Sequence, residues 1–357
     1  MASTVRTEFL LATKEDLPEA GRFLVDLGGP LFEERFPRRT CEQFYHWKYY
    51  ENPVGPAVVA IARAGSQIVS IAAAGPKRLH CDGQTYLVYE LGDFLTAPDH
   101  RRQGLFSKLI ELLCRETASR GAALVYVRPN ENSFPILVKH HGFQEVRRFD
   151  SRRFVLPSGA LSRRTVIPKK FWHAIGVDWM MLRLALSNAA DSQIQVERCS
   201  NFDGADYWWE TVRTAYRLSL VHDQTYFDWR YLACPTPYRI FRASREGKPA
   251  GWAVTFAHSK QPIGMILELL AAPDDREAVD ALLATCVPDM TNSGCSSIHT
   301  WTLDSAAESA SQHALTRLCR LRSEKMHIAV RCLAPQWTTS RLPERGWYLS
   351  LGGFDGS

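Results

Sequence analysis

Hydrophobic residues in the first 156 positions follow the spacings of short strands and amphipathic helices in turn. Apolar side chains recur every three or four positions in 14–27 and 106–120, whereas 57–62 and 67–77 are apolar runs that flank a glycine turn. The pattern predicts, in order, a strand (9–12), two helices (14–27, 40–51), a hairpin (57–62, 67–77), a strand (86–96), a helix (106–120), a strand (122–127), a helix (133–141) and a terminal hairpin (144–149, 152–156).

Part of this pattern returns later in the chain. The aromatic segment 44–49, Phe-Tyr-His-Trp-Lys-Tyr, corresponds to 226–231, Tyr-Phe-Asp-Trp-Arg-Tyr, at an offset of 182 residues, and a proline follows each segment four positions later. The same offset relates Gly65 to Gly247, each in a turn between two apolar stretches. Chance resemblance between two aromatic helices is the alternative, but the shared register favours two domains of one fold.

A chain of 357 residues is long enough for two domains. We expect a first domain at 1–156, a basic linker and helix at 157–194, a second domain at 195–335 and a tail at 336–357, to which the pattern assigns no structure. The linker carries an Arg-Arg and a Lys-Lys pair. Its charge marks either a solvated surface or a patch that contacts phosphates.

Composition argues against several classes of protein. The net charge of +5 is too small to indicate a nucleic-acid-binding domain. The nine cysteines form no CxxC pair and lie away from histidine clusters, which argues against a zinc site, and their odd, scattered number suits a reducing compartment. No stretch supplies the about 20 apolar residues of a membrane span, and residues 1–11 lack a signal-like run. We expect a soluble, cytoplasmic protein with no bound metal and no nucleic-acid or membrane partner.

Residues 99–108, Asp-His-Arg-Arg-Gln-Gly-Leu-Phe-Ser-Lys, carry most of the functional information in the sequence. They lie between a predicted strand and a predicted helix. The backbone N–H groups of a first helical turn have no partner within the helix, and the helix dipole favours negative charge there. Gly104 lets the backbone approach a ligand, and Arg101 and Arg102 add positive charge. The segment therefore predicts a phosphate-binding site.

The pattern Arg-x-x-Gly-x-Phe at 101–106 resembles the pyrophosphate loop of the GNAT acyltransferases, usually (Gln/Arg)-x-x-Gly-x-(Gly/Ala), and the predicted element order resembles a GNAT domain. The resemblance covers 1–156 and, more weakly, 195–335. It implies an α/β (α+β) fold of two tandem GNAT-like domains, each a mixed, mostly antiparallel sheet flanked by helices. It implies acetyl-CoA or another acyl-CoA as acyl donor. The residues that it assigns to coenzyme A are Phe94, Leu95, Thr96, Arg101, Arg102, Gln103, Gly104, Leu105, Phe106, Ser107, Asn130 and Asn132.

The two copies differ at this loop. Ala-Pro-Asp-His-Arg at 97–101 corresponds to Ala-Pro-Asp-Asp-Arg at 272–276, but Glu-Ala-Val follows in the second copy where the first has Arg-Gln-Gly. We therefore expect the second domain to have kept the fold and lost the cofactor site. Because pockets between domains are common ligand sites, its expected task is to shape the acceptor cleft.

Acyl transfer from a thioester to an amine needs a neutral amine, a polarised carbonyl and a protonated leaving group. In the resemblance Glu90, eleven residues before Arg101, corresponds to the general-base glutamate of GNAT enzymes that acetylate lysine. Burial in a cleft raises the pKa of such a carboxyl towards neutrality. The alternative is a surface or salt-bridged glutamate. Asp93 is the second candidate, because a bulge of the kind that GNAT strands often carry here would turn it towards the same face.

The resemblance assigns the remaining roles less completely. Main-chain groups at 94–96 would pair with the pantetheine arm and polarise the thioester carbonyl. The two asparagines of the coenzyme A set either bind the pantetheine or cap the following helix. Many GNAT enzymes have a tyrosine acid four residues before a Gly-Phe pair, and Val138 stands there in this chain. His140 or His141 is the candidate replacement, with helix capping as the alternative.

The expected acceptor is a primary amine of a small molecule. The two-domain layout resembles GNAT enzymes that acylate amino sugars, some of them carried on a nucleotide, and we expect a monomer because tandem domains can make within one chain a contact that single-domain relatives make by dimerising. An aminoglycoside-type antibiotic acetyltransferase and a non-catalytic acyl-CoA-binding protein are the alternatives. Arginines that suit a diphosphate, or equally a solvated surface, lie at 147, 148, 152, 153, 163 and 164. Acidic residues that suit a cationic acceptor are Asp203, Asp206, Glu210, Asp223 and Asp228.

Overall fold

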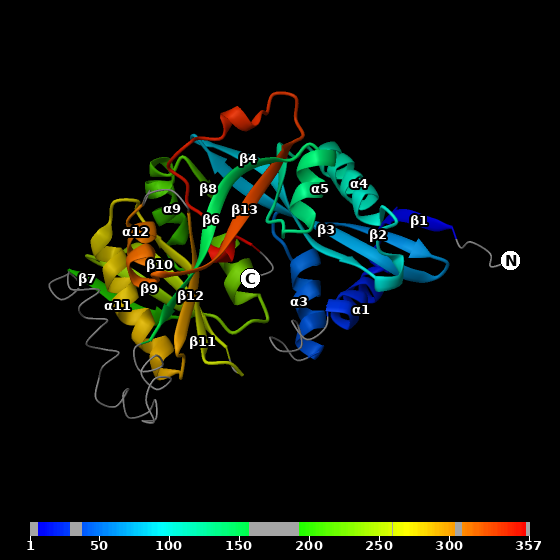
Figure 1. Cartoon of the computed structure of the whole chain (residues 1–357). Helices are drawn as coiled ribbons and strands as arrows, with labels where there is room; N and C mark the ends of the chain where they lie inside the picture. Colours follow the sequence, from blue (N-terminus) through cyan, green and yellow to red (C-terminus); the bar gives the residue numbers. More distant parts are fainter. Residues whose placement is uncertain (1–5, 29–37, 157–192, 259, 304–308, 355–357) are drawn as a thin grey trace.

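A computed structural model of the chain describes residues 6–28, 38–156, 193–258, 260–303 and 309–354 (Figure 1). The first half alternates strands and helices in the predicted order. Its elements are β1 (Thr7–Leu11), α1 (Leu17–Gly28), α3 (Arg38–Tyr50), β2 (Val58–Ala64), β3 (Gln67–Cys81), β4 (Gln84–Thr96), α4 (Leu105–Ser119), β5 (Leu124–Val127), α5 (Ser133–His140) and β6 (Gln144–Val155).

The second half repeats this order of elements with one added short strand, β8. Its elements are β7 (Ile194–Cys199), α9 (Ala205–Val212), β8 (Leu218–Leu220), α10 (Gln224–Phe227), β9 (Arg239–Arg245), β10 (Lys248–Ala257), β11 (Ile263–Ala271), α11 (Arg276–Asn292), β12 (Ser297–Leu303), α12 (Ala310–Leu318) and β13 (Leu321–Cys332). The second aromatic segment forms α10 and then a single π-turn at 228–232, so it is more irregular than α3.

The described strands form one 13-stranded sheet. Its order is β1-β2-β3-β4-β5-β13-β6-β12-β11-β10-β9-β7, and β8 pairs with β3 beside this path. The pairs β4–β5 and β11–β12 are parallel, and most of the others are antiparallel. In the first half, α4 and α5 cover one face of the sheet and α1 and α3 the other (Figure 1). The predicted mixed, mostly antiparallel sheet flanked by helices is therefore confirmed.

The predicted terminal hairpin at 144–149 and 152–156 is wrong, because β6 runs through these residues as one strand. The pair Asp150-Ser151 reads as a turn in the sequence. In the structure the Asp150 side chain is fully buried. Its carboxylate accepts a hydrogen bond of 3.0 Å from Arg152 and forms an ion pair of 3.0 Å with Arg322 of β13. These two guanidinium groups allow a carboxylate to stay inside the sheet, so the chain does not need to turn to keep it in water.

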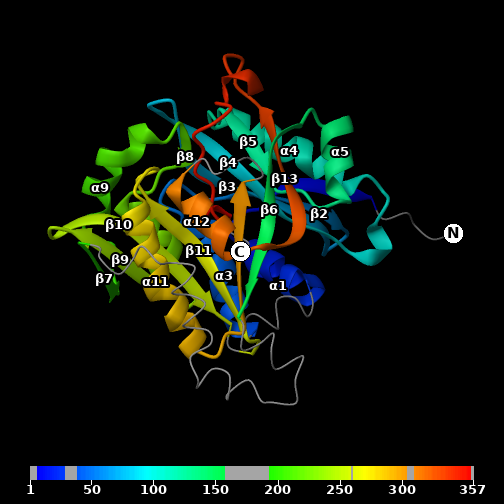
Figure 2. The same ribbon diagram turned by 60° about the vertical axis from the view of Figure 1, so that its left-hand side comes forward.

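The last strands of the two halves are exchanged. β6 pairs with β12 of the second half, β13 pairs with β5 of the first, and β6 and β13 pair with each other. Figure 2 shows β13, β6 and β12 side by side through the middle of the molecule. Each half therefore completes the sheet of the other, and main-chain hydrogen bonds join the two halves in addition to side-chain packing.

The repeated aromatic segments meet at the interface between the halves. Trp47 of α3 and its counterpart Trp229 stack with ring centroids 5.0 Å apart and planes inclined by 20°. The Trp47 indole N–H donates a hydrogen bond of 2.7 Å to the carbonyl oxygen of Trp229. Both side chains are buried. The sequence repeat therefore brings two matching residues into contact with each other.

None of the described helices is long and apolar enough to cross a membrane.

The exchange predicts that the first half cannot fold alone. Residues 1–156 produced by themselves would leave β5 without β13 and β6 without either neighbour, and such open edges associate with other chains. We expect this fragment to aggregate, and to become soluble when it is produced together with residues 157–357. Size-exclusion chromatography and thermal unfolding of both preparations measure this. A soluble, monomeric fragment that unfolds cooperatively would contradict the exchange.

A charged cluster at Glu145, with Arg148 in the same strand and His327 in β13, makes stability depend on pH. The Arg148 guanidinium and then His327 of β13 lower the pKa of Glu145 to about 2 from 4.5. A carboxylate with a lowered folded-state pKa stabilises the fold above its unfolded pKa, and this is lost as pH falls from about 4.5 to about 2. We expect Glu145→Gln to cost about 1–2 kcal/mol at pH 7, after solvent screening, and almost nothing near pH 2.

Denaturant unfolding of wild type and Glu145→Gln at several pH values provides the measurement. Glu116→Gln is the control, because Glu116 pairs with Arg120 within one exposed helix face. Such pairs contribute about 0.3–0.5 kcal/mol. A Glu145→Gln difference that stays constant from pH 7 to pH 3 would rule out this source of stability.

Candidate functional site

An opening between β4 and β5 lies at the centre of the site. The two parallel strands pair from Val88–Leu124 to Leu91–Val127, and β4 then continues to Thr96 beyond the end of β5. Within the described residues, the edge of β4 at 92–96 that faces away from β3 has no strand partner. The predicted coenzyme A residues of β4 lie along this edge. The carbonyl oxygens of Leu95 and Thr96 accept hydrogen bonds from Ser70 and Arg101, and the other main-chain groups that point away from β3 are available to a ligand.

The separation of the strands begins at a bulge in β4. Ala73 of β3 pairs with Gly92, and Ile71 pairs with Leu95, so two residues of β4, Asp93 and Phe94, stand opposite one of β3. Asp93 has a φ of +54°, a left-handed conformation that costs a residue with a side chain about 1 kcal/mol or more. The bulge on which the candidacy of Asp93 as a base depends is present, and it turns Asp93 towards α3.

The loop before α4 offers unpaired backbone donors. Arg102 and Gly104 have φ values of +61° and +74°, and α4 begins at Leu105 with no side chain capping its first turn. Among the described residues, no protein group accepts a hydrogen bond from the N–H groups of 102–107. A Cβ on Gly104 would meet no atom within 4 Å, so the space above the glycine is open. This arrangement fits the phosphates of an acyl-CoA.

Three side chains of the loop hold it in place through two hydrogen bonds to main-chain oxygens and one aromatic contact. Arg101 Nε donates to the carbonyl oxygen of Thr96 at 3.2 Å, and the Gln103 amide donates to the carbonyl oxygen of Asp99 at 3.3 Å. Phe106, which stands where the GNAT pattern has a small residue, packs edge-on against Phe94 with centroids 5.2 Å apart. Phe106 therefore fastens the loop to the β4 bulge.

The second repeat lacks these free donors. At the start of α11 the Asp275 carboxylate accepts a hydrogen bond of 3.0 Å from the N–H of Ala278. It also forms an ion pair of 2.9 Å with Arg245. An aspartate therefore occupies the anion position of this helix N-terminus, where Gly104 leaves the corresponding position of α4 open. The sequence expectation that the second loop cannot bind phosphate agrees with this geometry.

Glu90 faces the side of the sheet away from α4. Its neighbours Tyr89 and Leu91 pack into the α4 core, so alternation directs Glu90 to the opposite face. Its side chain is 12% exposed, and its Oε2 lies 3.9 Å from Nζ of Lys77, which is 2% exposed. A positive charge at this distance favours the carboxylate form, the form that a base needs before it accepts a proton.

Asp93 is held by α3. Its Oδ2 lies 2.8 Å from Nζ of Lys48 and accepts a hydrogen bond of 2.8 Å from the Tyr49 hydroxyl. Burial, and then the charge of Asp93, raise the pKa of Tyr49 well above its usual value, so the phenol stays a donor. These contacts support a structural task for Asp93, namely holding the left-handed residue at the bulge.

The second repeat contains the same pair of groups. Tyr231, the counterpart of Tyr49, donates a hydrogen bond of 2.7 Å to Glu268. Glu268 lies four residues before Ala-Pro-Asp at 272–274, as Asp93 lies four residues before Ala-Pro-Asp at 97–99. Because this tyrosine–carboxylate pair persists where the phosphate loop is lost, it belongs to the shared fold.

His141 is committed to contacts with α4. Its Nε2 lies 3.0 Å from Ser107 Oγ, its Nδ1 lies 2.7 Å from Glu111 Oε1, and the residue is 6% exposed. Val138, at the position of the missing tyrosine, is exposed and has no titratable group. His141 therefore joins α5 to the phosphate-loop helix, and the contacts give it a structural task.

The two asparagines after β5 differ. Asn130 Oδ1 accepts hydrogen bonds from the N–H groups of Asn132 and Ser133 at 3.0 and 2.9 Å, so it closes the turn before α5. Asn132 is exposed and makes no side-chain cap. The capping alternative therefore describes Asn130, whose amide nitrogen still faces solvent near the end of β5.

Several charged residues that suggested acceptor types have internal partners. Arg148 pairs with Glu145, and Arg152 is buried against Asp150 and Thr302. Asp223 caps α10 and pairs with Arg78 of β3 at 2.7 Å. The arginines at 163 and 164 lie outside the described residues. Asp203, Asp206 and Glu210 are exposed, whereas the two arginines and the aspartate named above are held by partners within the protein.

Four residues near the two candidate bases were not predicted from the sequence. Lys48 and Tyr49 contact Asp93, Lys77 lies beside Glu90, and Trp229 contacts Lys77. Lys77 ends the predicted strand 67–77 and is followed by Arg78, so the sequence gives no signal that its ammonium is buried. In the described part of the chain, no three acidic, cysteine or histidine side chains gather as a metal site requires.

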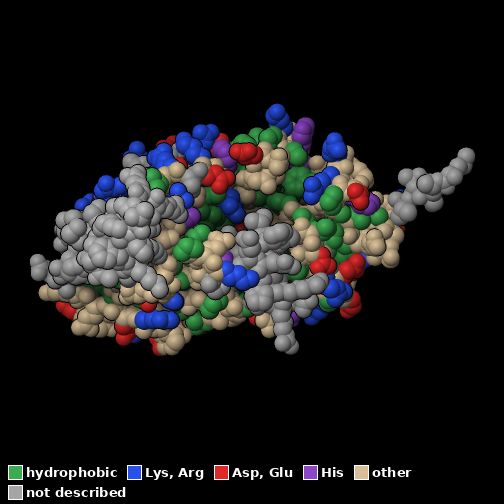
Figure 3. Space-filling view, turned by 60° about the horizontal axis from the view of Figure 1, so that its bottom comes forward, with side chains coloured by type: hydrophobic (Ala, Val, Ile, Leu, Met, Phe, Trp, Pro, Cys, Tyr) green, Lys and Arg blue, Asp and Glu red, His purple; other side chains and the backbone are tan. Residues whose placement is uncertain are grey.

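A pocket of about 880 Å³ lies between α1 and α3. Tyr45, His46, Tyr49 and Tyr50 of α3 line it, and Arg22 of α1 adds a cation. Tyr49 joins this pocket to the β4 bulge through its bond to Asp93. Figure 3 shows this side of the molecule, where hydrophobic side chains border a hollow near its middle.

Residues 30–139 match the family model of the acetyltransferase (GNAT) domain. A search of the curated proteins finds none that matches the sequence. The region matched includes the opening between β4 and β5, the phosphate loop and most of α5. The first half of the chain therefore contains a GNAT domain.

Solved structures extend this likeness over both halves. A GCN5-related N-acetyltransferase from Anabaena variabilis has 12% identity and a TM-score of 0.62, over 92% of this chain and 73% of that one. A tandem GNAT protein from the clavulanic acid biosynthesis pathway has 11% identity and a TM-score of 0.59, over 93% and 100%. The N-myristoyltransferase of Saccharomyces cerevisiae, solved with myristoyl-CoA, has 10% identity and a TM-score of 0.57, over 98% and 90%. At these identities the likeness establishes the fold, which is that of tandem GNAT proteins.

The open space above Gly104 predicts a selective effect of substitution there. Gly104→Val places a side chain at a φ of +74° and covers the free N–H groups, so we expect a stability loss of about 1 kcal/mol and coenzyme A binding weakened about tenfold or more. Calorimetric titration with coenzyme A and thermal unfolding measure the two effects.

Gly83→Val is the matched control. Gly83 turns between β3 and β4 with a φ of +84° and also has no atom within 4 Å of a Cβ. It should lose comparable stability and keep coenzyme A affinity. Equal affinity in both variants would remove the loop from the binding site.

Proposed function

We propose that this protein is an acyl-CoA-dependent N-acyltransferase whose active site lies in the first GNAT domain. The observation that carries the proposal is the uncapped N-terminus of α4, which opens beside the separated strands β4 and β5. The phosphates bind the free N–H groups of 102–107, and the pantetheine arm lies along the free edge of β4 at 92–96. The family match over this region supports the assignment.

Glu90 is the proposed general base. It accepts a proton from the acceptor amine, the amine nitrogen forms a bond to the acyl carbon, and the carbon–sulfur bond of the thioester breaks. Glu90 is nearly buried, and its Oε2 lies 3.9 Å from Nζ of Lys77, whose charge favours the carboxylate form that a base needs. Solvent protonates the departing thiolate, since Val138 carries no proton and His141 is held between Ser107 and Glu111.

The proposed acceptor is the amino group of a small molecule, most specifically an amino sugar, free or linked to a nucleotide. The pocket between α1 and α3 supports this class, because aromatic rings line it together with hydroxyl groups, and Lys14 and Arg22 supply cations for a phosphate. Its volume of about 880 Å³ exceeds what a small amine needs and admits a molecule of nucleotide-sugar size.

Glu90→Gln tests the chemistry. We expect kcat to fall about 100-fold or more, because a positioned base contributes at least that factor, while the KM for acyl-CoA stays unchanged. Free-thiol release is followed with acetyl-CoA and longer acyl-CoAs against amino-sugar nucleotides, free amino sugars and aminoglycosides. Asp93→Asn is the comparison variant, and its structural contacts predict a lower melting temperature with a smaller effect on kcat.

The outcomes separate the alternatives. Thiol release with amino sugars that Glu90→Gln removes supports the proposal. Release with aminoglycosides alone would assign the acceptor to the antibiotic class. Tight coenzyme A binding without release in any combination would instead indicate a binding protein.

A further inference from the structure

The ring of Trp229 is fixed at the interface between the two repeats. It stacks on Trp47 at 5.0 Å, and its carbonyl oxygen accepts the Trp47 indole N–H at 2.7 Å. Trp47 is 1% and Trp229 is 5% exposed. A second-repeat residue is thus held rigidly against a first-repeat helix.

The Trp229 ring also contacts Lys77 of β3. Lys77 Nζ lies 4.6 Å from the centroid of the Trp229 ring, within the range of a cation–π interaction. The same Nζ lies 3.9 Å from Oε2 of Glu90. Because Lys77 is 2% exposed, water competes little for its charge, and both contacts are stronger than they would be at the surface.

We propose that Trp229 of the second repeat is a positioning residue for Glu90 of the first, acting through Lys77. The inference rests on the proposed role of Glu90 as the base. A lysine side chain has four rotatable bonds, so its ammonium needs a second contact to remain beside one carboxylate. The face of Trp229 supplies that contact, and the ammonium then sets both the orientation and the charge of Glu90.

Other charges near the pair are compensated locally. Lys48 lies 2.8 Å from Asp93, and Arg78 lies 2.7 Å from Asp223. These cations therefore contribute less to Glu90 than Lys77 does. Further titratable or charged groups on the elements packed around Lys77 and Glu90 include Tyr126 of β5, Arg128 directly after β5, Tyr49 of α3, Tyr226 of α10 and the buried Arg230 beside Trp229.

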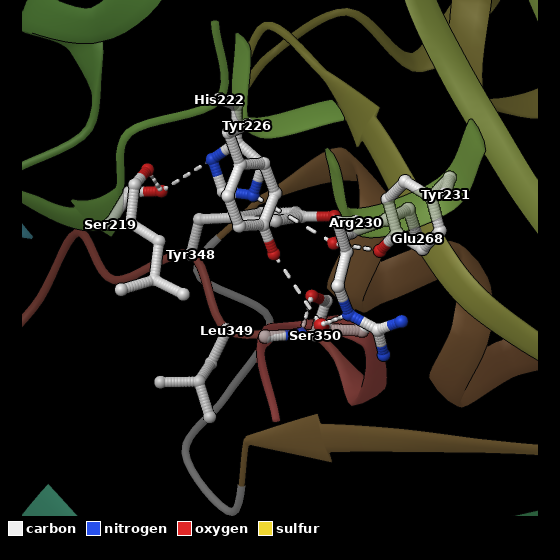
Figure 4. A network of polar contacts seen from close by, with 12 residues as sticks. Ser219, His222, Tyr226, Arg230, Tyr231, Glu268, Tyr348, Leu349 and Ser350 are labelled. Atoms are coloured by element: carbon white, nitrogen blue, oxygen red, sulfur yellow. Dashed lines mark hydrogen bonds and ion pairs between the residues drawn. The ribbon is translucent and has the colours of Figure 1, made fainter. Parts of the chain in front are cut away.

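The other tryptophan of the stack, Trp47, also makes a cation–π contact, and the cation there has a different role. Arg230 lies over the ring of Trp47 at 5.7 Å, so each stacked tryptophan carries a cation from the other repeat. Arg230 is fully buried and donates to the carbonyl oxygens of Gly352 and Phe354 at 2.9 and 3.3 Å (Figure 4). In the second repeat the cation fastens the C-terminal segment, whereas in the first it contacts the carboxylate before the phosphate loop.

The test is the pH dependence of kcat/KM for wild type, Trp229→Leu, Trp229→Phe and Lys77→Met. Loss of the ammonium makes the Glu90 carboxylate harder to form, so its pKa rises and the acidic limb of the profile moves to higher pH. We expect Trp229→Leu to move this limb and to lower kcat near neutral pH between about threefold and thirtyfold, the range of cation–π contacts. Trp229→Phe should retain part of the effect, and the KM for acyl-CoA should not change.

Trp252→Leu is the matched control. Trp252 is fully buried in the same aromatic core, but its ring contacts are with Phe202, Trp208 and Phe227. This variant should lower the melting temperature as much as Trp229→Leu does and leave the acidic limb in place. The double variant Trp229→Leu/Lys77→Met should match Lys77→Met alone, because Trp229 acts through Lys77.

Two results would overturn the proposal while leaving the acyltransferase intact: a Trp229→Leu profile like that of Trp252→Leu, or full additivity in the double variant. If Trp229→Leu does not fold, Trp229→Phe replaces it, because this variant keeps a ring in the stack. An acidic limb that stays in place both in Trp229→Phe and in Lys77→Met would also overturn the proposal. Full activity of Glu90→Gln would instead remove the base assignment itself.

Discussion

The exchange of β6 and β13 is the constraint on which the rest of the structure depends. β5 spans four residues, Leu124–Val127, yet it forms one wall of the opening proposed for the pantetheine arm. With β13 paired along its other side, β5 is an interior strand, so its position is fixed from both edges. The second half therefore builds the site of the first directly, through main-chain hydrogen bonds, although its own loop is closed by Asp275.

The two repeats separate what the fold needs from what the chemistry needs. Both keep the stacked tryptophans and the tyrosine–carboxylate bond at the strand before the loop, Tyr49–Asp93 and Tyr231–Glu268. These pairs therefore serve packing and the shape of the bulge. The features present in the first copy and replaced in the second are the open N-terminus at Gly104 and the carboxylate of Glu90 facing a buried ammonium. This comparison favours Glu90 over Asp93 as the base, on evidence within one molecule.

Local pattern predicted the elements and the loop because both depend on neighbouring residues. The spacing of apolar positions places α4 correctly, and Gly104 marks the turn before it. The terminal hairpin failed because a polar pair such as Asp150-Ser151 indicates a turn unless distant arginines satisfy it, and one of them, Arg322, lies in the other half of the chain. The strand exchange is likewise invisible to local reasoning.

The sequence repeat relates residues that are far apart in the chain, but it does not show which of them are in contact. The offset of 182 residues identified Trp229 as the counterpart of Trp47, yet equivalence in sequence does not say that two residues touch. Lys77 stands beside Arg78 at the end of a predicted strand, and its contacts with Trp229 and Glu90 appear only in the folded chain. Side chains whose partners come from both halves are thus the part of the site that the sequence left unspecified.

The C-terminal segment gives the final contrast between the copies. In the second repeat Gly352 lies against the tyrosine–carboxylate pair so closely that a Cβ would overlap Tyr231 and Glu268. Although burial opposes it, the nearby His222 ring and hydrogen bonds from Tyr348 and Tyr231 lower the pKa of Glu268, so a charged group stays inside this covered network (Figure 4).

In the first repeat the equivalent tyrosine, Tyr49, lines the pocket between α1 and α3. One copy of the pair is therefore sealed by the chain itself, and the other borders a space of ligand size. The second repeat is therefore closed at two places where the first is open, by an aspartate at the helix N-terminus and by a segment over the tyrosine–carboxylate pair, and either alone would close a site built on this plan.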